Sequence, residues 1–223
     1  MIKLEKTEVF GWDAAIRGMR NAMNSWEKSD SYWTHVENPE TLNTAKFQFF
    51  VGNNDLKLMR SLVKAGSDHR KFLRMIDVTV DITAPLYWWK EYDTYKVSTV
   101  ANSCSTMHKI HAKEFTLDDF SHEHLDSWSI SVLESVISML NHNREMFINY
   151  DQYQGGKPSK KSLWWQMIQL LPSSYNQKRT VQLNYEVLLN MYHARKTHKL
   201  DEWHTLCDWI ETLPYFKEIC LEE

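Results

Sequence analysis

Alternation of apolar and polar residues between Ile76 and Thr83 constrains the fold more than any other feature of the sequence. In this segment, IDVTVDIT, the four apolar side chains from Ile76 to Ile82 fall on one face of an extended chain, and the polar ones fall on the other. This period of two predicts a β-strand with one buried face. Pro85 follows where the first turn of a helix accepts proline, so Pro85–Tyr95 is predicted to be a helix that leaves the end of the strand.

Helical spacing of apolar residues recurs through the rest of the chain. It predicts helices at Trp12–Trp26, Asp55–Ala65, Ser129–Phe147, Leu163–Leu171, Tyr185–Arg195 and Asp201–Leu213, and shorter extended patterns predict strands near Ile2–Phe10 and at Arg179–Leu183. We expect the helix from Ser129, with Asp126 or Ser127 as its cap, to be central to the core, and Asn184 to cap the helix that ends at Arg195. The sequence, 43% hydrophobic over 223 residues and without repeats, predicts one α+β domain covering residues 1–223.

Three segments lack these periodicities. Tyr32–Thr44 is polar, contains a proline and is only weakly patterned. Val97–Thr106, VSTVANSCST, is small, polar and β-branched, and is predicted to be an irregular loop that faces a ligand. Gln154–Lys161 combines glycines, a proline and lysines, and is the best candidate for a loop or lid.

Composition argues against several classes of function. A formal net charge of −3 and an isoelectric point near 6.4 give no general attraction for a nucleic-acid polymer or an anionic membrane, so neither is expected as a partner. The N-terminal segment lacks a signal-peptide core, which predicts a cytoplasmic location. Cys104, Cys207 and Cys220 have no CxxC spacing and are expected to be free thiols. The histidine spacing matches no recognised metal site, so no metal is expected.

Two segments carry a recognisable combination of residues. In Ala84–Thr99, APLYWWKEYDTYKVST, an Ala-Pro pair is followed by a helix and a loop rich in small polar residues. In Leu170–Arg195, four residues keep characteristic separations: Pro172, Asn184, Asn190 and Arg195. Together the segments resemble the flavin-dependent thymidylate synthases, homotetramers that methylate deoxyuridylate with FAD, methylenetetrahydrofolate and NADPH. The resemblance implies a small mixed or antiparallel sheet packed by several helices, a homotetramer, these cofactors and a pyrimidine deoxynucleotide substrate.

The resemblance also implies that the stretch Ile76–His108 and the helix ending at Arg195 build one shared pocket for the flavin and the pyrimidine nucleotide, with roles for individual residues. Asn184 and Asn190 would contact flavin, and His69 matches a flavin-contacting histidine. Arg195 would orient and polarise the base, since a guanidinium suits a carbonyl that gathers negative charge. Tyr95 and Lys96 occupy the second and third positions of an Arg-His-Arg triplet in the family, so the resemblance implies that they too contact the flavin cofactor.

Substrate contacts are expected from the helix after the strand and from the following loop. Glu91 stands where the family has a glutamine; as an acceptor-only carboxylate it could recognise an amino group such as that of cytosine, or it is an exposed helical glutamate. Ser103 and Ser105 lie in the loop expected to cradle phosphate. Cys104, at or beside the motif serine, could attack the pyrimidine, with His108 as the nearby base, or it is a small, partly buried thiol.

Two further features each allow a functional and a structural interpretation. Lys96 could hold a phosphate or could stabilise a helix end. The pairs Trp88–Trp89 and Trp164–Trp165 could stack on flavin or folate, or could pack in the core or a subunit interface.

Several cationic positions of the family are not cationic in this chain. Thr94 and Tyr95 replace the first two residues of the triplet, Ile168 replaces an arginine before the Leu-Pro pair, and Thr106 or Met107 replaces another. A charge-assisted hydrogen bond contributes about 1.5–3 kcal/mol, so these losses weigh against ordinary deoxyuridylate binding. Two hypotheses follow: an enzyme that transfers a one-carbon unit to a pyrimidine deoxynucleotide, or a catalytically inactive relative that binds a nucleotide or a protein.

Overall fold

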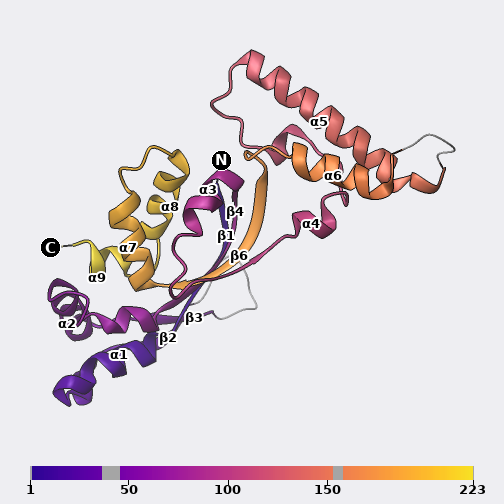
Figure 1. Ribbon diagram of the computed structural model, residues 1–223. Helices are drawn as coiled ribbons and strands as arrows, with labels where there is room; N and C mark the ends of the chain where they lie inside the picture. The colour runs from indigo at the N-terminus through magenta and orange to yellow at the C-terminus, as the bar shows by residue number, and fades with distance from the viewer. Residues whose placement is uncertain (1, 37–45, 153–157, 223) are drawn as a thin grey trace.

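The alternating segment forms β4 (Asp77–Pro85), an inner strand of a four-stranded sheet in the order β1-β4-β6-β5 (Figure 1). In this computed structural model, which describes residues 2–36, 46–152 and 158–222, the other strands are β1 (Lys3–Phe10), β5 (Val100–Ser103) and β6 (Asn176–Asn184). Every pairing in the sheet is antiparallel. The predicted α+β class is confirmed. Of the two sheet types expected, mixed or antiparallel, the sheet is antiparallel.

β4 buries one face, as its period of two predicts. Val78, Val80 and Ile82 are at most 1% exposed, whereas the residues between them are half-buried. The register sets Val80 opposite Val181 of β6. A slip of one residue would turn this apolar set to the other face, so its burial specifies the register.

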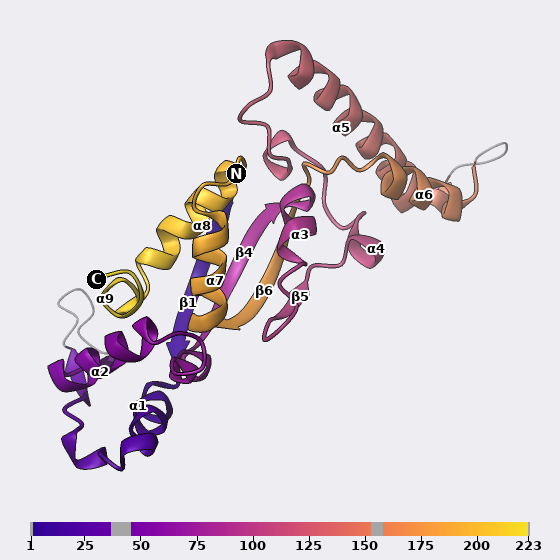
Figure 2. The same cartoon turned by 60° about the vertical axis from the view of Figure 1, so that its left-hand side comes forward.

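Helices pack over the sheet and bury a large aromatic cluster against it (Figure 2). They are α3 (Leu86–Tyr92), α7 (Tyr185–Arg195) and α8 (Asp201–Glu211), with α9 (Phe216–Cys220) beyond them. Trp88 and Trp89 are at most 1% exposed, and the Trp88 ring centroid lies 4.9 Å from that of Trp203. This tryptophan pair therefore belongs to the core and is not a surface for stacking a cofactor.

The N-terminal part adds two helices and a two-stranded sheet beyond the end of β1. The helices are α1 (Trp12–Arg20) and α2 (Asn53–Lys64), and the strands are β2 (Tyr32–Val36) and β3 (Lys46–Phe50). The helix predicted to reach Trp26 ends at Arg20, because the chain tightens into a 3-10 turn and Asn24 adopts a φ of 45°. The structure contains five short 3-10 turns among its described residues: Asn21–Met23, Trp26–Lys28, Lys71–Met75, Leu117–Asp119 and Tyr150–Gln152.

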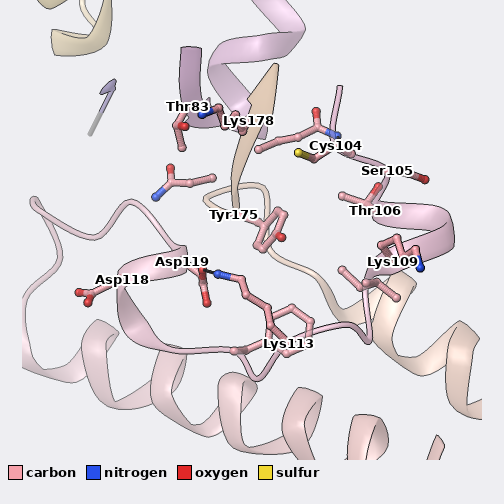
Figure 3. Close-up of a pocket in the computed structure, with 14 residues that line it drawn as sticks. Thr83, Cys104, Ser105, Thr106, Lys109, Lys113, Asp118, Asp119, Tyr175 and Lys178 are labelled. Carbon is pink, nitrogen blue, oxygen red and sulfur yellow. Dashed lines mark hydrogen bonds and ion pairs between the residues drawn. The ribbon is translucent and has the colours of Figure 1, made fainter. Parts of the chain in front are cut away.

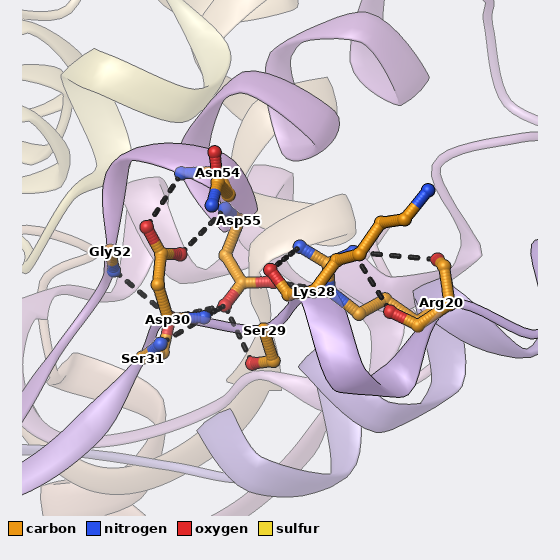
Figure 4. A network of polar contacts seen from close by, with 9 residues as sticks. Arg20, Lys28, Ser29, Asp30, Ser31, Gly52, Asn54 and Asp55 are labelled. Atoms are coloured by element: carbon orange, nitrogen blue, oxygen red, sulfur yellow. Dashed lines mark hydrogen bonds and ion pairs between the residues drawn. The ribbon is translucent and has the colours of Figure 1, made fainter.

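A buried ion pair holds this part together (Figure 4). Arg20 Nε donates to Asp55 Oδ1 at 2.7 Å, and the two residues are 3% and 0% exposed. The hydroxyls of Ser29 and Ser31 both donate to Asp55 Oδ2 at 2.7 Å. Burial by itself would raise the pKa of Asp55, but the hydrogen bonds from Ser31, Ser29 and Arg20 outweigh it and hold that pKa below its usual value of 3.8.

The chain between β5 and β6 forms an arm that projects from one end of the sheet (Figure 1). It contains α4 (Thr106–Lys109), α5 (Ser127–Ile148) and α6 (Lys160–Leu170). Its apolar residues form a separate small cluster around Phe120, Leu140 and Met167. The expectation that α5 is central to the main core is therefore wrong: this helix lies in the arm and leaves Trp128 81% exposed.

The start of α5 depends on the predicted Asp126 cap. The carboxylate Oδ1 of Asp126 accepts a hydrogen bond from the Ser129 backbone N–H at 2.8 Å. Asp126→Ala leaves this N–H without its side-chain acceptor, so we expect the free energy of unfolding in urea to fall by about 1 kcal/mol. Glu134→Ala, at an exposed position of the same helix, is the control and is expected to change stability by less than about 0.5 kcal/mol.

Two of the unpatterned segments contain strands. β2 lies in Tyr32–Val36, and β5 lies within Val97–Thr106, which was expected to be irregular. β5 is exposed and receives its backbone hydrogen bonds from β6, about 80 residues later along the chain, so no local period marks it. Of the predicted lid, residues 154–157 lie outside the described residues, and Lys160 and Lys161 begin α6 behind the Ser159 cap. None of the described helices is long and apolar enough to cross a bilayer.

Candidate functional site

Asn184 joins β6 to α7 and borders a cavity of about 510 Å³. Its side-chain Oδ1 accepts from the Val187 backbone N–H at 3.1 Å, so the predicted cap is confirmed, and the side chain is buried. This Asn184 cavity is lined by Arg74, Thr94, Tyr95, Lys96, Val97, Ser98, Asn184, Glu186, Val187 and Asn190. It collects four of the residues predicted to contact a flavin, from segments about 90 residues apart.

Positive charge dominates the uncommitted groups of the Asn184 cavity. Arg70 neutralises Glu186: its Nε donates to Glu186 Oε2 at 3.0 Å. Its Nη2 also lies 3.5 Å from Asn190 Oδ1. Arg74 and Lys96 have no ion pair among the described residues. The cavity therefore offers two free cations and the amide N–H donors of Asn190 to an anionic ligand.

Sequence reasoning missed Arg70, Arg74 and Glu186. Arg70 directly follows the predicted His69, and Glu186 lies on the same helix as Asn190, but their pairing spans 116 residues and has no local signature. His69 itself is exposed in the turn after α2 and does not line the Asn184 cavity.

A cluster of side chains holds Arg195 next to the Asn184 cavity. Tyr95 belongs to this cluster and also lines the cavity. Arg195 Nε donates to the Tyr95 hydroxyl at 2.8 Å, and its Nη1 donates to Glu91 Oε2 at 2.8 Å. The guanidinium carbon also lies 4.6 Å from the Trp203 ring centroid, as in a cation–π contact. Glu91 is therefore ion-paired although its side chain stays 37% exposed, and the predicted Glu91, Tyr95 and Arg195 come together.

Cys104 lines a second cavity of about 550 Å³, between the sheet and the arm (Figure 3). Its backbone is fixed on both sides: Cys104 N–H donates to the Lys178 carbonyl at 2.9 Å, and Gln177 Nε2 donates to the Cys104 carbonyl at 2.8 Å. The Ser105 hydroxyl accepts from His108 N–H at 3.0 Å and so caps α4. The Cys104 side chain is exposed, not partly buried. In this described segment, residues 102–110, His108 makes no hydrogen bond to the Cys104 thiol, so the proposed base does not contact it.

The cations of this Cys104 cavity are mostly paired. Lys113 is bound to Asp119, and Lys178 lies 3.0 Å from Asp81, which raises the pKa of Lys178 through that hydrogen bond. Lys109 has no ion pair among the described residues. Thr106 also lines the cavity, whereas Ile168 packs with the apolar cluster of the arm, so neither offers a cation for phosphate.

The predicted site residues do not form one pocket within a single chain. Cys104 lies beside Lys178 near the start of β6, and Asn184 ends that strand six residues later, a separation of about 20 Å at the rise of a β-strand. Ser103 and Ser105 lie with Cys104 at the far end. One chain therefore has a cationic cavity beside the Arg195 cluster and a separate cavity beside Cys104.

Solved structures identify the fold. No family model matches the sequence, and no curated protein matches it either. A structure of thymidylate synthase X from Helicobacter pylori with FAD and dUMP superposes with a TM-score of 0.64 over 100% of this chain and 98% of that chain, at 14% identity. A second structure of the flavin-dependent thymidylate synthase from Helicobacter pylori, complexed with FAD and dUMP, gives a TM-score of 0.65 at 15% identity over 99% and 98% of the two chains. The protein therefore has the fold of the flavin-dependent thymidylate synthases, at a sequence identity of 14–15% to these two structures.

Proposed function

We propose that this protein is an FAD-dependent enzyme that methylates a pyrimidine deoxynucleotide at ring carbon five. The observation that carries the proposal is the Asn184 cavity, which brings together Tyr95, Lys96, Asn184 and Asn190 in a fold whose solved relatives bind FAD and dUMP. The product would be dTMP from dUMP or a related C5-modified nucleotide. Methylenetetrahydrofolate is the proposed carbon donor and NADPH the proposed reductant.

The lining of the cavity has the chemistry that a flavin nucleotide requires. Lys96 and Arg74 would hold its phosphates, since both are cations without an ion pair among the described residues. Asn190 would donate through its amide nitrogen, and Asn184 through the part of its amide that the helix cap leaves free. Bound flavin supplies the hydride chemistry that side chains cannot perform.

Arg195 is the proposed group that orients and polarises the base. Its contacts with Tyr95, Glu91 and Trp203 fix the guanidinium before any ligand arrives. A donor that is already oriented stabilises developing charge without the cost of reorganisation. The Arg195 cluster therefore suits the base, and the cationic cavity beside it suits the phosphates of flavin.

A second copy of the chain is part of the proposal. Ser103, Cys104 and Ser105 are the proposed contacts to the substrate phosphate and ring, but they lie about 20 Å from Asn184 within one chain. They would act on the same ligand from a neighbouring copy, as in the homotetramer that the resemblance implies. Cys104 would be the nucleophile of this loop.

Flavin binding gives the direct test. We expect purified protein to be yellow and to bind FAD at close to one per chain, and Lys96→Ala to weaken binding about tenfold or more through the loss of a charge-assisted hydrogen bond. Absorbance titration of FAD measures both. Lys57→Ala, which removes an exposed cation from α2, is the control and should bind FAD like the wild type.

A catalytically inactive binding protein is the second candidate. Two observations favour this candidate. Arg195 already has hydrogen-bond partners within the chain. Thr106 and Ile168, which stand at cationic positions of the family, offer no positive charge to a substrate phosphate. Colourless protein that fails to take up added FAD would support this candidate and exclude the flavin-dependent enzyme.

A further inference from the structure

Glu91 and Arg195 together present an uncommitted hydrogen-bonding edge. The Glu91 atom Oε2 accepts from Arg195 Nη1 at 2.8 Å and lies 3.1 Å from His198 Nε2. Arg195 uses its Nε for the Tyr95 hydroxyl. Within the part of the chain that the structure describes, Glu91 Oε1 and Arg195 Nη2 make no hydrogen bond. One acceptor atom and one donor nitrogen of this ion pair are thus left for a ligand.

This edge is fixed in place and open to a ligand. Trp203, which is fully buried, supports the guanidinium of Arg195 at 4.6 Å, and Tyr95 holds it from another side. The Arg195 and Glu91 side chains are 18% and 37% exposed. A ligand that reaches Arg195 therefore meets the Glu91 carboxylate as its immediate neighbour.

The charges at this edge favour a neutral polar group. The Glu91 carboxylate and the Arg195 guanidinium compensate each other at 2.8 Å. A phosphate placed here would meet a carboxylate that repels it, whereas the edge of a nucleobase carries no net charge. The edge therefore suits a base that offers a hydrogen-bond donor next to an acceptor.

From this geometry we infer that the base is a 4-aminopyrimidine, so that the nucleotide is of the cytosine type, such as dCMP. This inference rests on the proposed function, in which Arg195 addresses the base. Cytosine presents its exocyclic amino donor beside the acceptors N3 and O2. The amino group donates to Glu91 Oε1 while Arg195 Nη2 donates to the neighbouring ring acceptor N3, so the donor and the acceptor next to each other on the base are both paired.

Uracil fits the same edge less well. Its single N–H lies between two carbonyl oxygens, and the edge contains one carboxylate acceptor beside one guanidinium. If the N–H donates to Glu91 and Arg195 binds one carbonyl, the other carbonyl lies next to the carboxylate without a donor. A site built around a carboxylate acceptor therefore discriminates against the base that lacks the amino group. Glu91 is thus a specificity-determining residue.

Nucleotide binding to the FAD-loaded protein tests the inference. Calorimetric titration with dCMP and with dUMP is expected to show about tenfold or tighter binding of dCMP by the wild type. Glu91→Gln supplies an amide that donates as well as accepts, so it is expected to lose this preference or to reverse it in favour of dUMP. Glu134→Gln, the same chemical change at an exposed position of α5, is the matched control and should keep the wild-type preference.

The outcomes separate this inference from the proposed function. Wild-type protein that holds FAD but binds dUMP as tightly as dCMP, or more tightly, overturns the cytosine assignment and leaves the flavin enzyme in place. Wild-type protein that binds neither nucleotide also overturns it, and the flavin content of the same sample shows whether the proposed function fails too. Because the comparison of dCMP with dUMP uses the wild type, the inference stays testable even if Glu91→Gln does not fold.

Discussion

Arg195→Ala is expected to lower the rate of nucleotide methylation about 100-fold to 1000-fold while FAD remains bound. The guanidinium is the proposed donor to the charge that develops on the base, and loss of one oriented donor of this kind costs a factor of that size. FAD binding should persist, because Arg195 is not among the residues that line the Asn184 cavity. Release of tritium from deoxynucleotide labelled at carbon five, together with flavin absorbance, measures both quantities.

Two further variants separate chemistry from folding. Arg195→Lys keeps the positive charge but not the planar fork that binds Tyr95 and Glu91 at once, so we expect an activity between those of the wild type and Arg195→Ala. Lys196→Ala removes an exposed cation one residue further on and should have wild-type activity. Wild-type turnover in a folded Arg195→Ala protein would refute the role of Arg195.

Asp55→Asn is expected to reduce the free energy of unfolding by about 3–5 kcal/mol. The substitution keeps the size of the side chain but leaves the buried Arg20 without its counter-charge, and breaking a buried pair from one side has a cost of this order. The new amide nitrogen would also face groups that donate to the carboxylate at present, such as the Ser29 and Ser31 hydroxyls. Urea unfolding monitored by tryptophan fluorescence measures the change.

The same carboxylate gives stability a defined pH dependence. Because the folded state lowers the pKa of Asp55 below 3.8, its contribution is fully present above the unfolded pKa and is lost as the pH falls through the folded pKa. The stability difference between wild type and Asp55→Asn should therefore shrink only under acid conditions, below about pH 4. Asp68→Asn, at an exposed position, is the control and should shift stability by less than about 0.5 kcal/mol at neutral pH. An Asp55→Asn protein as stable as this control would show that the pair does not stabilise the fold.

Those residues of the candidate site that lie in one recognisable segment could be predicted from the sequence. Asn184 caps the helix that carries Asn190 and Arg195, so their spacing and the cap could be read directly. Arg70 and Glu186 could not, since they meet across 116 residues. The partners of Arg195 were equally hidden, because Glu91 lies 104 residues away and only packing of α3 beside α7 brings the two together.

What the sequence alone determined is local: the period of two in β4, the helical spacing of α7 and the caps at Asp126 and Asn184. Each depends on residues within a few positions of one another, so local sterics and hydrogen bonding decide it. The tertiary structure alone decided that β5 is a strand, that α5 lies outside the main core, and that Cys104 and Asn184 occupy separate cavities. These features arise from contacts between distant segments, whose hydrogen bonds and buried surface exist only once the chain has folded.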